Sequence, residues 1–334
     1  MEDGESIGKV MAMELRNLGT SGLKVSAVGL GCNNLGGRLD RAGTLKLIPA
    51  AIDLGLTLFD TADAYPVGKS GLSETLLGEA LGPRRKEVVI ATKFGNVMRP
   101  DDPMCGSSRH WIMRAVEASL QRLNTDWIDL YQVHFPDAAT PIDETLRALD
   151  DLIRQGKVRY IGCSNFAGWQ IAQARAVARE LGSNAFASDQ DEYSLLVREV
   201  EREIIPATRA SGMGFLPYFP LASGFLTGKY RRNAPMPDGA RITVAKVFQD
   251  NFLTDENWDI VERLEDFAST RGHTLLDLAF SWLLANPTVS SVIAGATSTE
   301  QVKANVAAAG WKLSPDDLAA IDRISPLPKT KKIH

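Results

Sequence analysis

Short apolar runs alternate with longer stretches of helical periodicity along most of the chain. The runs have the length of buried strands, and glycines follow many of the helical stretches, where helices commonly end. The predicted strands cover residues 27–31, 57–60, 88–92, 128–133, 159–163, 186–190, 214–218 and 291–294. The predicted helices between them cover residues 41–54, 72–81, 108–123, 142–155, 168–181, 198–210 and 299–309. This repeat predicts an α/β fold and favours a (β/α)8 TIM barrel over a doubly wound sheet.

Three segments depart from the repeat. Residues 14–25 contain two strand-like runs around a glycine-rich turn and predict a β-hairpin that caps the barrel. A long loop after the seventh strand contains a Pro/Gly-rich stretch and two helical patterns, and loops of this length are usually functional. The additional helices are predicted at 255–271, 274–285 and 314–324. The expected organisation is a disordered leader at 1–12, a single barrel domain at 13–325 and a C-terminal tail at 326–334.

Composition and charge narrow the classes of function. The chain has 334 residues, of which 44% are hydrophobic and 23% charged, as in ordinary globular proteins. A net charge of -4 gives no overall basic field for nucleic acid or a membrane surface, although it permits a local patch for a phosphate. Three widely spaced cysteines and four histidines without an HExxH motif argue against a disulfide scaffold or a metal cluster. Without a signal-peptide core or an 18-residue apolar stretch, the protein is expected to be cytoplasmic.

Polar side chains stand at or just beyond the ends of three consecutive predicted strands. Asp60 ends the second strand, and Tyr65 follows it after five residues. Lys93 directly follows the third strand, and His134 directly follows the fourth. Because all strand C-termini of a parallel barrel meet on one face, we expect these side chains to converge there.

These four residue types suit the donation of a proton to a carbonyl oxygen. A tyrosine hydroxyl has a pKa of about 10 and is a poor acid unless a nearby cation favours its ionised form. Lys93 would be that cation, Asp60 would hold the ammonium, and His134 would orient a substrate carbonyl. With no metal or nucleophile pair apparent in the sequence, hydride delivery by a cofactor would be the complementary step.

Other interpretations of these segments are weaker. Residues 65–69 have the YxxxK spacing of short-chain dehydrogenases, but a proline and a glycine disfavour the helix that this chemistry needs. Residues 29–34 form only part of a dinucleotide fingerprint, and residues 63–70 form only part of a phosphate loop. Each of the four polar residues alone also has an ordinary explanation, such as a helix N-cap for an aspartate after a strand. Their joint placement favours an active site.

Several segments, in the expected order, resemble the aldo-keto reductase superfamily. They include Phe59-Asp-Thr-Ala-Asp-Ala-Tyr65, Ile90-Ala-Thr-Lys-Phe-Gly95 and Asp129-Leu-Tyr-Gln-Val-His134, followed by similar segments at 156–165 and 220–230. The long loop is more similar to the bacterial and potassium-channel β-subunit-like branches than to vertebrate aldose reductases. The resemblance implies a (β/α)8 barrel that reduces carbonyl groups with an extended nicotinamide cofactor. It makes Tyr65 the general acid, Lys93 and Asp60 its tuners, and His134 the group that orients the carbonyl.

The resemblance also implies three groups of cofactor-binding residues. At the nicotinamide end they are Ser164, Asn165, Gln190 and Tyr218. Around the pyrophosphate they are Leu221, Ser223 and Lys229. At the adenosine end they are Gly295, Thr297, Gln301 and Asn305. No metal-binding residue is expected.

Two departures from the family pattern bear on the cofactor. Phe219 stands where the family usually has serine, which matters only if the side chain rather than the backbone is used. Many relatives have an arginine for the 2′-phosphate of NADP near the position of Thr297. Arg241 in the long loop resembles a phosphate-binding arginine of the channel-subunit branch, and Lys303 is a weaker candidate. Because arginine suits bidentate phosphate recognition, NADP(H) is favoured, with NAD(H) possible.

The leading hypothesis is an NADP(H)-dependent oxidoreductase that reduces an aldehyde or ketone, or oxidises the corresponding alcohol. The alternatives are an NAD(H)-preferring alcohol or sugar dehydrogenase of the same fold and a non-catalytic, cofactor-binding regulatory subunit. A barrel hydrolase is disfavoured because no second acid ends a strand beside Asp60. The expected partner is a small carbonyl or alcohol substrate, whose identity the sequence leaves open, as it does the oligomeric state. The residues suggested to line its pocket, any of which could instead be packing, are Asn33, Phe94, Met98, Trp111 and Phe135.

Overall fold

Eight parallel strands form a closed ring in the computed structural model, which describes residues 13–96, 105–244 and 246–328. The strands are β3 (Val28–Gly31), β4 (Leu58–Asp60), β5 (Val89–Phe94), β6 (Ile128–Val133), β7 (Val158–Ser164), β8 (Ser188–Gln190), β9 (Gly214–Phe215) and β10 (Val292–Gly295). They pair in the order β10-β3-β4-β5-β6-β7-β8-β9. The amide of Phe215 donates to the Thr288 carbonyl at 2.8 Å, and the amide of Ser290 donates to the Phe215 carbonyl at 2.9 Å, which closes the ring. The predicted (β/α)8 barrel is confirmed.

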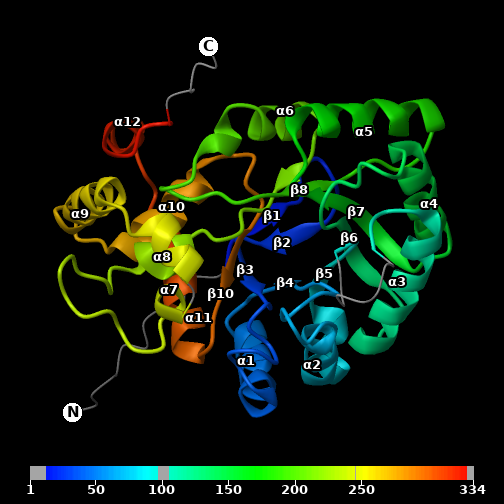
Figure 1. Ribbon diagram of the computed structural model, residues 1–334, viewed down its shortest axis with the longest axis horizontal. Coiled ribbons are helices and arrows are strands. Elements are labelled where there is room, and N and C mark those ends of the chain that lie inside the picture. Colours follow the sequence, from blue (N-terminus) through cyan, green and yellow to red (C-terminus); the bar gives the residue numbers. More distant parts are fainter. Residues whose placement is uncertain (1–12, 97–104, 245, 329–334) are drawn as a thin grey trace, which may run out of the picture.

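Helices surround the strands on the outside of the barrel (Figure 1). Those that follow the strands are α1 (Arg41–Asp53), α2 (Leu72–Leu81), α3 (Arg109–Leu123), α4 (Ile142–Arg154), α5 (Gly168–Leu181), α6 (Ile204–Ala210) and α11 (Thr299–Ala307). Side-chain caps fix several of their first turns, because the first backbone amides of a helix have no partner within it. Asp40 accepts from the Gly43 amide at the start of α1, and Ser108 accepts from the Trp111 amide at the start of α3.

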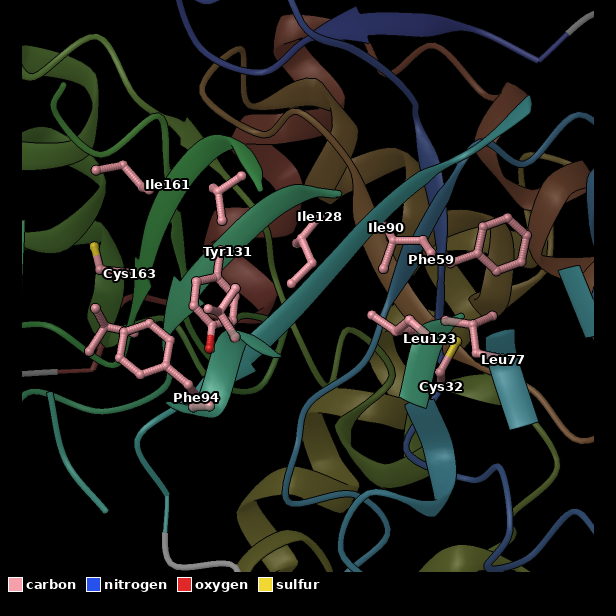
Figure 2. Packing of buried hydrophobic residues seen from close by; sticks show 14 of the residues in the cluster. Cys32, Phe59, Leu77, Ile90, Phe94, Leu123, Ile128, Tyr131, Ile161 and Cys163 are labelled. Carbon is pink, nitrogen blue, oxygen red and sulfur yellow. The ribbon is translucent and has the colours of Figure 1, made fainter. Parts of the chain in front are cut away.

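The main core lies between the strands and the surrounding helices. Figure 2 shows a part of it, in which apolar side chains from strands and helices pack together. The rings of Phe94 on β5 and Tyr131 on β6 lie 4.6 Å apart there, and both residues are fully buried. Side chains along each strand alternate between this outer layer and the barrel interior. The residues that lie between the outward-facing apolar residues of a strand therefore point into the barrel.

The predicted β-hairpin is present as β1 (Leu15–Asn17) and β2 (Lys24–Ser26), which pair antiparallel. Leu18 and Val25 of this hairpin region form a small apolar cluster with strand residues such as Leu58 and Leu130. Glycine at position 19 is required because a Cβ there would lie 2.4 Å from the carbonyl oxygen of Gly212. The hairpin, which precedes the first barrel strand in the chain, therefore packs against the barrel.

The long segment after β9 contains more helix than predicted. It comprises the 3₁₀ segment η3 (Ala222–Thr227) and the helices α7 (Arg241–Val244), α8 (Lys246–Phe252), α9 (Asp255–Ser269) and α10 (Leu275–Ala285). The helices α7 and α8 escaped prediction because they are short and follow a Pro/Gly-rich stretch. α12 (Pro315–Ile324), with a Ser314–Asp317 capping box, was predicted. Within the described ranges, none of the helices combines the length and hydropathy required to cross a bilayer.

Two predicted elements are much shorter in the structure. The helix predicted at 198–210 is interrupted, with the 3₁₀ turn η2 (Glu199–Glu201) preceding α6. Arg198 turns inward there and binds the carboxylates of Glu201 and Asp322. The strand predicted at 214–218 is reduced to β9, because Pro217 lacks an amide to donate to a strand ladder. The predicted leader at 1–12 lies outside the described residues, as does the end of the predicted tail.

Candidate active site

A cavity of about 790 Å³ is lined by residues at the C-terminal ends of the barrel strands and in the loops that follow them. Asp60, Tyr65 and His134 line it, and so do all twelve residues predicted to bind the cofactor. Lys93 is fully buried behind Asp60 and bonds to it. The structure therefore brings together residues from positions 60 to 305 of the chain, as the convergence of strand ends predicts.

Lys93 and Asp60 form a buried ion pair across neighbouring strands. The Lys93 ammonium donates to the two carboxylate oxygens of Asp60 at 2.8 and 2.7 Å and to the Thr61 carbonyl at 3.0 Å. Burial disfavours the charged ammonium, but the Asp60 carboxylate outweighs this effect and raises the pKa of Lys93. Lys93 therefore stays charged at the base of the cavity.

Tyr65 reaches the cavity by a turn that follows β4. The Lys93 ammonium lies 5.4 Å from the centroid of its ring. Burial raises the pKa of Tyr65, while Lys93 opposes the rise, as does Arg241. The expected lowering by Lys93 is thus present, but burial outweighs it, because the cation is also neutralised by Asp60. The hydroxyl stays protonated at neutral pH, which is the state that a proton donor needs.

His134 is a neutral imidazole in this site. Its ring makes an edge contact with Tyr65, with ring centroids 5.7 Å apart, and stacks on Phe135 at 4.9 Å. Burial, assisted by the charge of Lys93, lowers the pKa of His134 to about 3. A neutral imidazole carries one N–H, so it can donate to a carbonyl oxygen without taking the proton of Tyr65.

One wall of the cavity is a hydrogen-bonded network around Asn165. Its amide donates to the His134 carbonyl at 2.9 Å, and the Tyr218 hydroxyl donates to its side-chain oxygen at 2.9 Å. The Ser164 hydroxyl donates to the Gln190 carbonyl at 2.7 Å. The side-chain amide of Gln190 donates to Asp60 at 2.9 Å, which couples this predicted cofactor contact to the ion pair.

Another part of the cavity is suited to an anion. Ala222, Ser223 and Gly224 all have positive φ values, an arrangement that exposes backbone amides, and the buried Ser223 hydroxyl has no hydrogen-bond partner among the described residues. Lys229 and Arg241 line the same cavity, and neither has an acidic partner in the described part of the chain. Burial lowers the pKa of both side chains. Lys229 is exposed and Arg241 is half-buried, and two such cations without acidic partners, beside the unpartnered Ser223 hydroxyl, fit the phosphates of a nicotinamide dinucleotide.

The adenosine-end residues also line the cavity, at the start of α11. The Thr297 amide donates to the Gln301 side-chain oxygen at 2.8 Å, which orders this loop. Lys303, the weaker candidate for a phosphate contact, is exposed and is not among the lining residues.

Gln132 and Arg38 are among the residues of the site that sequence reasoning missed. Gln132 donates weakly to Asp60 at 3.4 Å, and its position two residues before His134 on β6 could have placed it on the same inward face. Arg38 lines the cavity from the loop after β3 and donates to the carbonyl of Gly239, another lining residue, at 2.6 Å. No pattern in the sequence marks that contact, because it joins two irregular loops.

The suggested substrate-lining residues divide into three groups. Asn33 and Phe135 line the cavity. Phe94 and Trp111 do not, because both side chains pack in the outer core between the strands and α3, so this part of the expectation was wrong. Met98 lies outside the described residues.

Comparisons with known proteins identify the family. Residues 27–326 match the model of the aldo/keto reductase family. The chain is 37% identical over 325 residues to an uncharacterized oxidoreductase, YrpG, of Bacillus subtilis, covering 95% of this chain and 97% of that protein. It is 38% identical over 303 residues to a probable voltage-gated potassium channel subunit beta of Oryza sativa subsp. japonica, covering 89% and 91% of the two chains. It is also 32% identical over 336 residues to the versiconal hemiacetal acetate reductase of Aspergillus parasiticus, covering 93% and 96%.

The family match and the relatives thus make this (β/α)8 barrel an oxidoreductase. The chain belongs to the aldo/keto reductase family.

Proposed function

We propose that this protein is an NADP(H)-dependent reductase of aldehydes or ketones that can also oxidise the corresponding alcohols. The observation that carries the proposal is the buried Lys93–Asp60 ion pair beside Tyr65, at the base of a cavity large enough for a dinucleotide. The arrangement places a cation beside a tyrosine that lines the cavity. It suits a reaction in which a proton moves to or from an oxygen at the Tyr65 hydroxyl.

In the proposed reaction Tyr65 is the general acid for carbonyl reduction and the general base for alcohol oxidation. A nicotinamide cofactor, when bound, supplies or accepts the hydride. The Lys93 ammonium stabilises the negative charge that Tyr65 acquires when it gives up its proton, and Asp60 holds the ammonium in position. His134, being neutral, donates a hydrogen bond to the carbonyl oxygen and thereby orients the substrate.

The proposed cofactor site follows the cavity from Gln190 to Asn305. Ser164, Asn165 and Gln190 would bind the nicotinamide amide, and the ring of Tyr218 would stack on the nicotinamide. The segment around Leu221, Ser223 and Lys229 would hold the pyrophosphate, and the residues Gly295, Thr297, Gln301 and Asn305 would hold the adenosine. Arg241 would bind the 2′-phosphate, since its guanidinium has no acidic partner in the part of the chain that the structure describes. This supports NADP(H) over NAD(H).

The test is a titration of the purified protein with NADPH and NADH, followed by tryptophan fluorescence, and then a panel of aromatic aldehydes and sugars with the preferred nucleotide. Binding that is tighter for NADPH, with aldehyde-dependent oxidation of NADPH, supports the proposal. Tighter binding of NADH would favour the NAD(H)-preferring dehydrogenase. Failure to bind either nucleotide would overturn the proposed function.

A second candidate function is a cofactor-binding regulatory subunit. It is favoured by the 38% identity to proteins named as probable voltage-gated potassium channel subunits beta in Oryza sativa and Arabidopsis thaliana. The cavity and its cations would serve this function equally well. NADPH binding without turnover of any carbonyl in the panel would support it.

A further inference from the structure

Phe219 adopts a backbone conformation that is costly for its residue type. Its φ is +50°, in the left-handed region that bulky side chains rarely occupy. Such a conformation is strained and persists where the surrounding structure imposes it, commonly at functional sites. The residue lies in the wall of the cavity, directly after Tyr218. Its side chain therefore deserves a functional explanation beyond filling space.

The ring of Phe219 forms one side of an aromatic clamp on Arg241. The guanidinium carbon of Arg241 lies 4.7 Å from the centroid of Phe219 and 5.4 Å from the centroid of Phe248 on α8. The two rings lie 5.9 Å apart and are nearly perpendicular, at 87°. Both distances are within the range of a cation–π interaction.

No acidic side chain forms an ion pair with Arg241 among the described residues. The two aromatic rings are therefore the principal contacts that hold its guanidinium in place. Burial and the neighbouring charge of Arg38 both disfavour the guanidinium where it stands. Two aromatic faces offset part of this cost and leave the N–H groups at the edge of the guanidinium without a carboxylate partner. An arginine held in this way is prepared to bind an anion in the cavity.

We propose that Phe219 determines cofactor specificity, because its ring, together with Phe248, clamps the Arg241 guanidinium at the cavity wall in position to bind the 2′-phosphate of NADP(H). The inference rests on the proposed function, in which Arg241 binds that phosphate. In this proposal the side chain of Phe219, which replaces the serine usual in the family, acts through Arg241.

The first experiment compares the affinities of NADPH and NADH in Phe219→Leu and Phe219→Tyr. Leucine keeps an apolar side chain without the aromatic face, and tyrosine keeps the face. The preference for NADPH over NADH should fall roughly three- to thirtyfold in Phe219→Leu, as expected for the loss of one partly buried cation–π contact, and should return in Phe219→Tyr. In an Arg241→Ala background, Phe219→Leu should cause no further loss of preference. Additive losses, or equal losses for both nucleotides, would overturn the proposal.

The second experiment measures the clamp without any nucleotide. Trypsin cleavage after Arg241 requires this loop to open, because the next residue, Ile242, is fully buried. Phe219→Leu should speed cleavage after Arg241, measured by peptide mass spectrometry. Cleavage after Arg231, which pairs with Glu265 at 3.0 Å instead, should not change and serves as the internal control. An unchanged rate at Arg241 would overturn the clamp.

The two experiments separate the inference from the proposed function. Faster cleavage together with a reduced NADPH preference supports both. Faster cleavage with an unchanged preference would support the contact between Phe219 and Arg241 but would contradict the role of Arg241 in choosing the cofactor. That result would overturn the specificity that we assign to Phe219.

Discussion

The ammonium of Lys93 on β5 bonds to both carboxylate oxygens of Asp60 on β4, and both side chains are almost completely buried. Removing one partner from such a pair leaves an uncompensated buried charge, which typically costs about 3–5 kcal/mol. We expect Asp60→Asn to lower the free energy of unfolding by about 3 kcal/mol, measured by urea denaturation. The double variant Asp60→Asn/Lys93→Met should recover part of this loss. Additive losses would show that the two side chains are not coupled.

Tyr65 is expected to matter for turnover and much less for cofactor affinity. Phe at this position keeps the ring, and hence its contacts with Lys93 and His134, but removes the proton. General acid catalysis contributes about 10²–10⁴-fold, so kcat should fall by this factor while the Kd for NADPH changes less than about twofold. Steady-state kinetics and a fluorescence titration of the same preparation measure the two quantities. Near-normal turnover would remove Tyr65 from the role of proton donor.

The neutral state of His134 predicts a specific feature of the pH profile. Its pKa is lowered to about 3, so it does not change charge between pH 5 and 8. The kcat/KM for an uncharged aldehyde should therefore show no titration near pH 6.5, the ordinary value for histidine. The matched control is His273, which is partly exposed, stacks on Trp311 and is not among the residues that line the cavity. A pH limb near 6.5 that disappears in His134→Gln but persists in His273→Gln would contradict the neutral imidazole.

The parts of the site that the sequence could predict are those carried by regular structure. The alternation of strand side chains and the common direction of barrel strands suffice to bring Asp60, Lys93 and His134 together. The direction in which the pKa of Tyr65 shifts was not predictable, because burial raises this pKa while Lys93, itself neutralised by Asp60, lowers it. The clamp on Arg241 was not predictable either, because it depends on how irregular segments pack and on a strained φ at position 219.

Arg241 should discriminate between the two nucleotides. Its substitution by alanine removes a charge that the 2′-phosphate of NADPH would meet and that NADH would not. We expect Arg241→Ala to weaken NADPH binding by about tenfold or more, with a change of less than about threefold for NADH. Fluorescence titrations with both nucleotides at one salt concentration measure this difference. Equal weakening would exclude Arg241 from recognition of the 2′-phosphate.

Asp63 is a buried acid that the proposed mechanism does not use. It is fully buried, and neither of its carboxylate oxygens has a hydrogen-bond partner among the described residues. Its neighbour Glu74 is also buried and bonds to Arg122 and Thr92, both at 2.6 Å. Burial, reinforced by the charge of Glu74, raises the pKa of Asp63 well above its ordinary value. The folded protein therefore holds a proton on Asp63 at pH values where the unfolded chain has released it.

Because the folded protein keeps this proton, its free energy of unfolding should decrease as the pH rises. As pH rises above about 4, the unfolded chain loses the Asp63 proton first, so the free energy of unfolding falls by up to about 1.4 kcal/mol per pH unit until the native group titrates. Asp63→Asn removes this penalty, and its stability relative to the wild type should rise between pH 5 and 8 in urea denaturation. The control is Asp137, whose pKa is lowered, against the cost of burial, by hydrogen bonds from Ser107, Ala139 and Thr140. Asp137→Asn should be less stable than the wild type throughout this range, without that rise. Parallel pH dependence of Asp63→Asn and the wild type would show that Asp63 is already ionised in the fold.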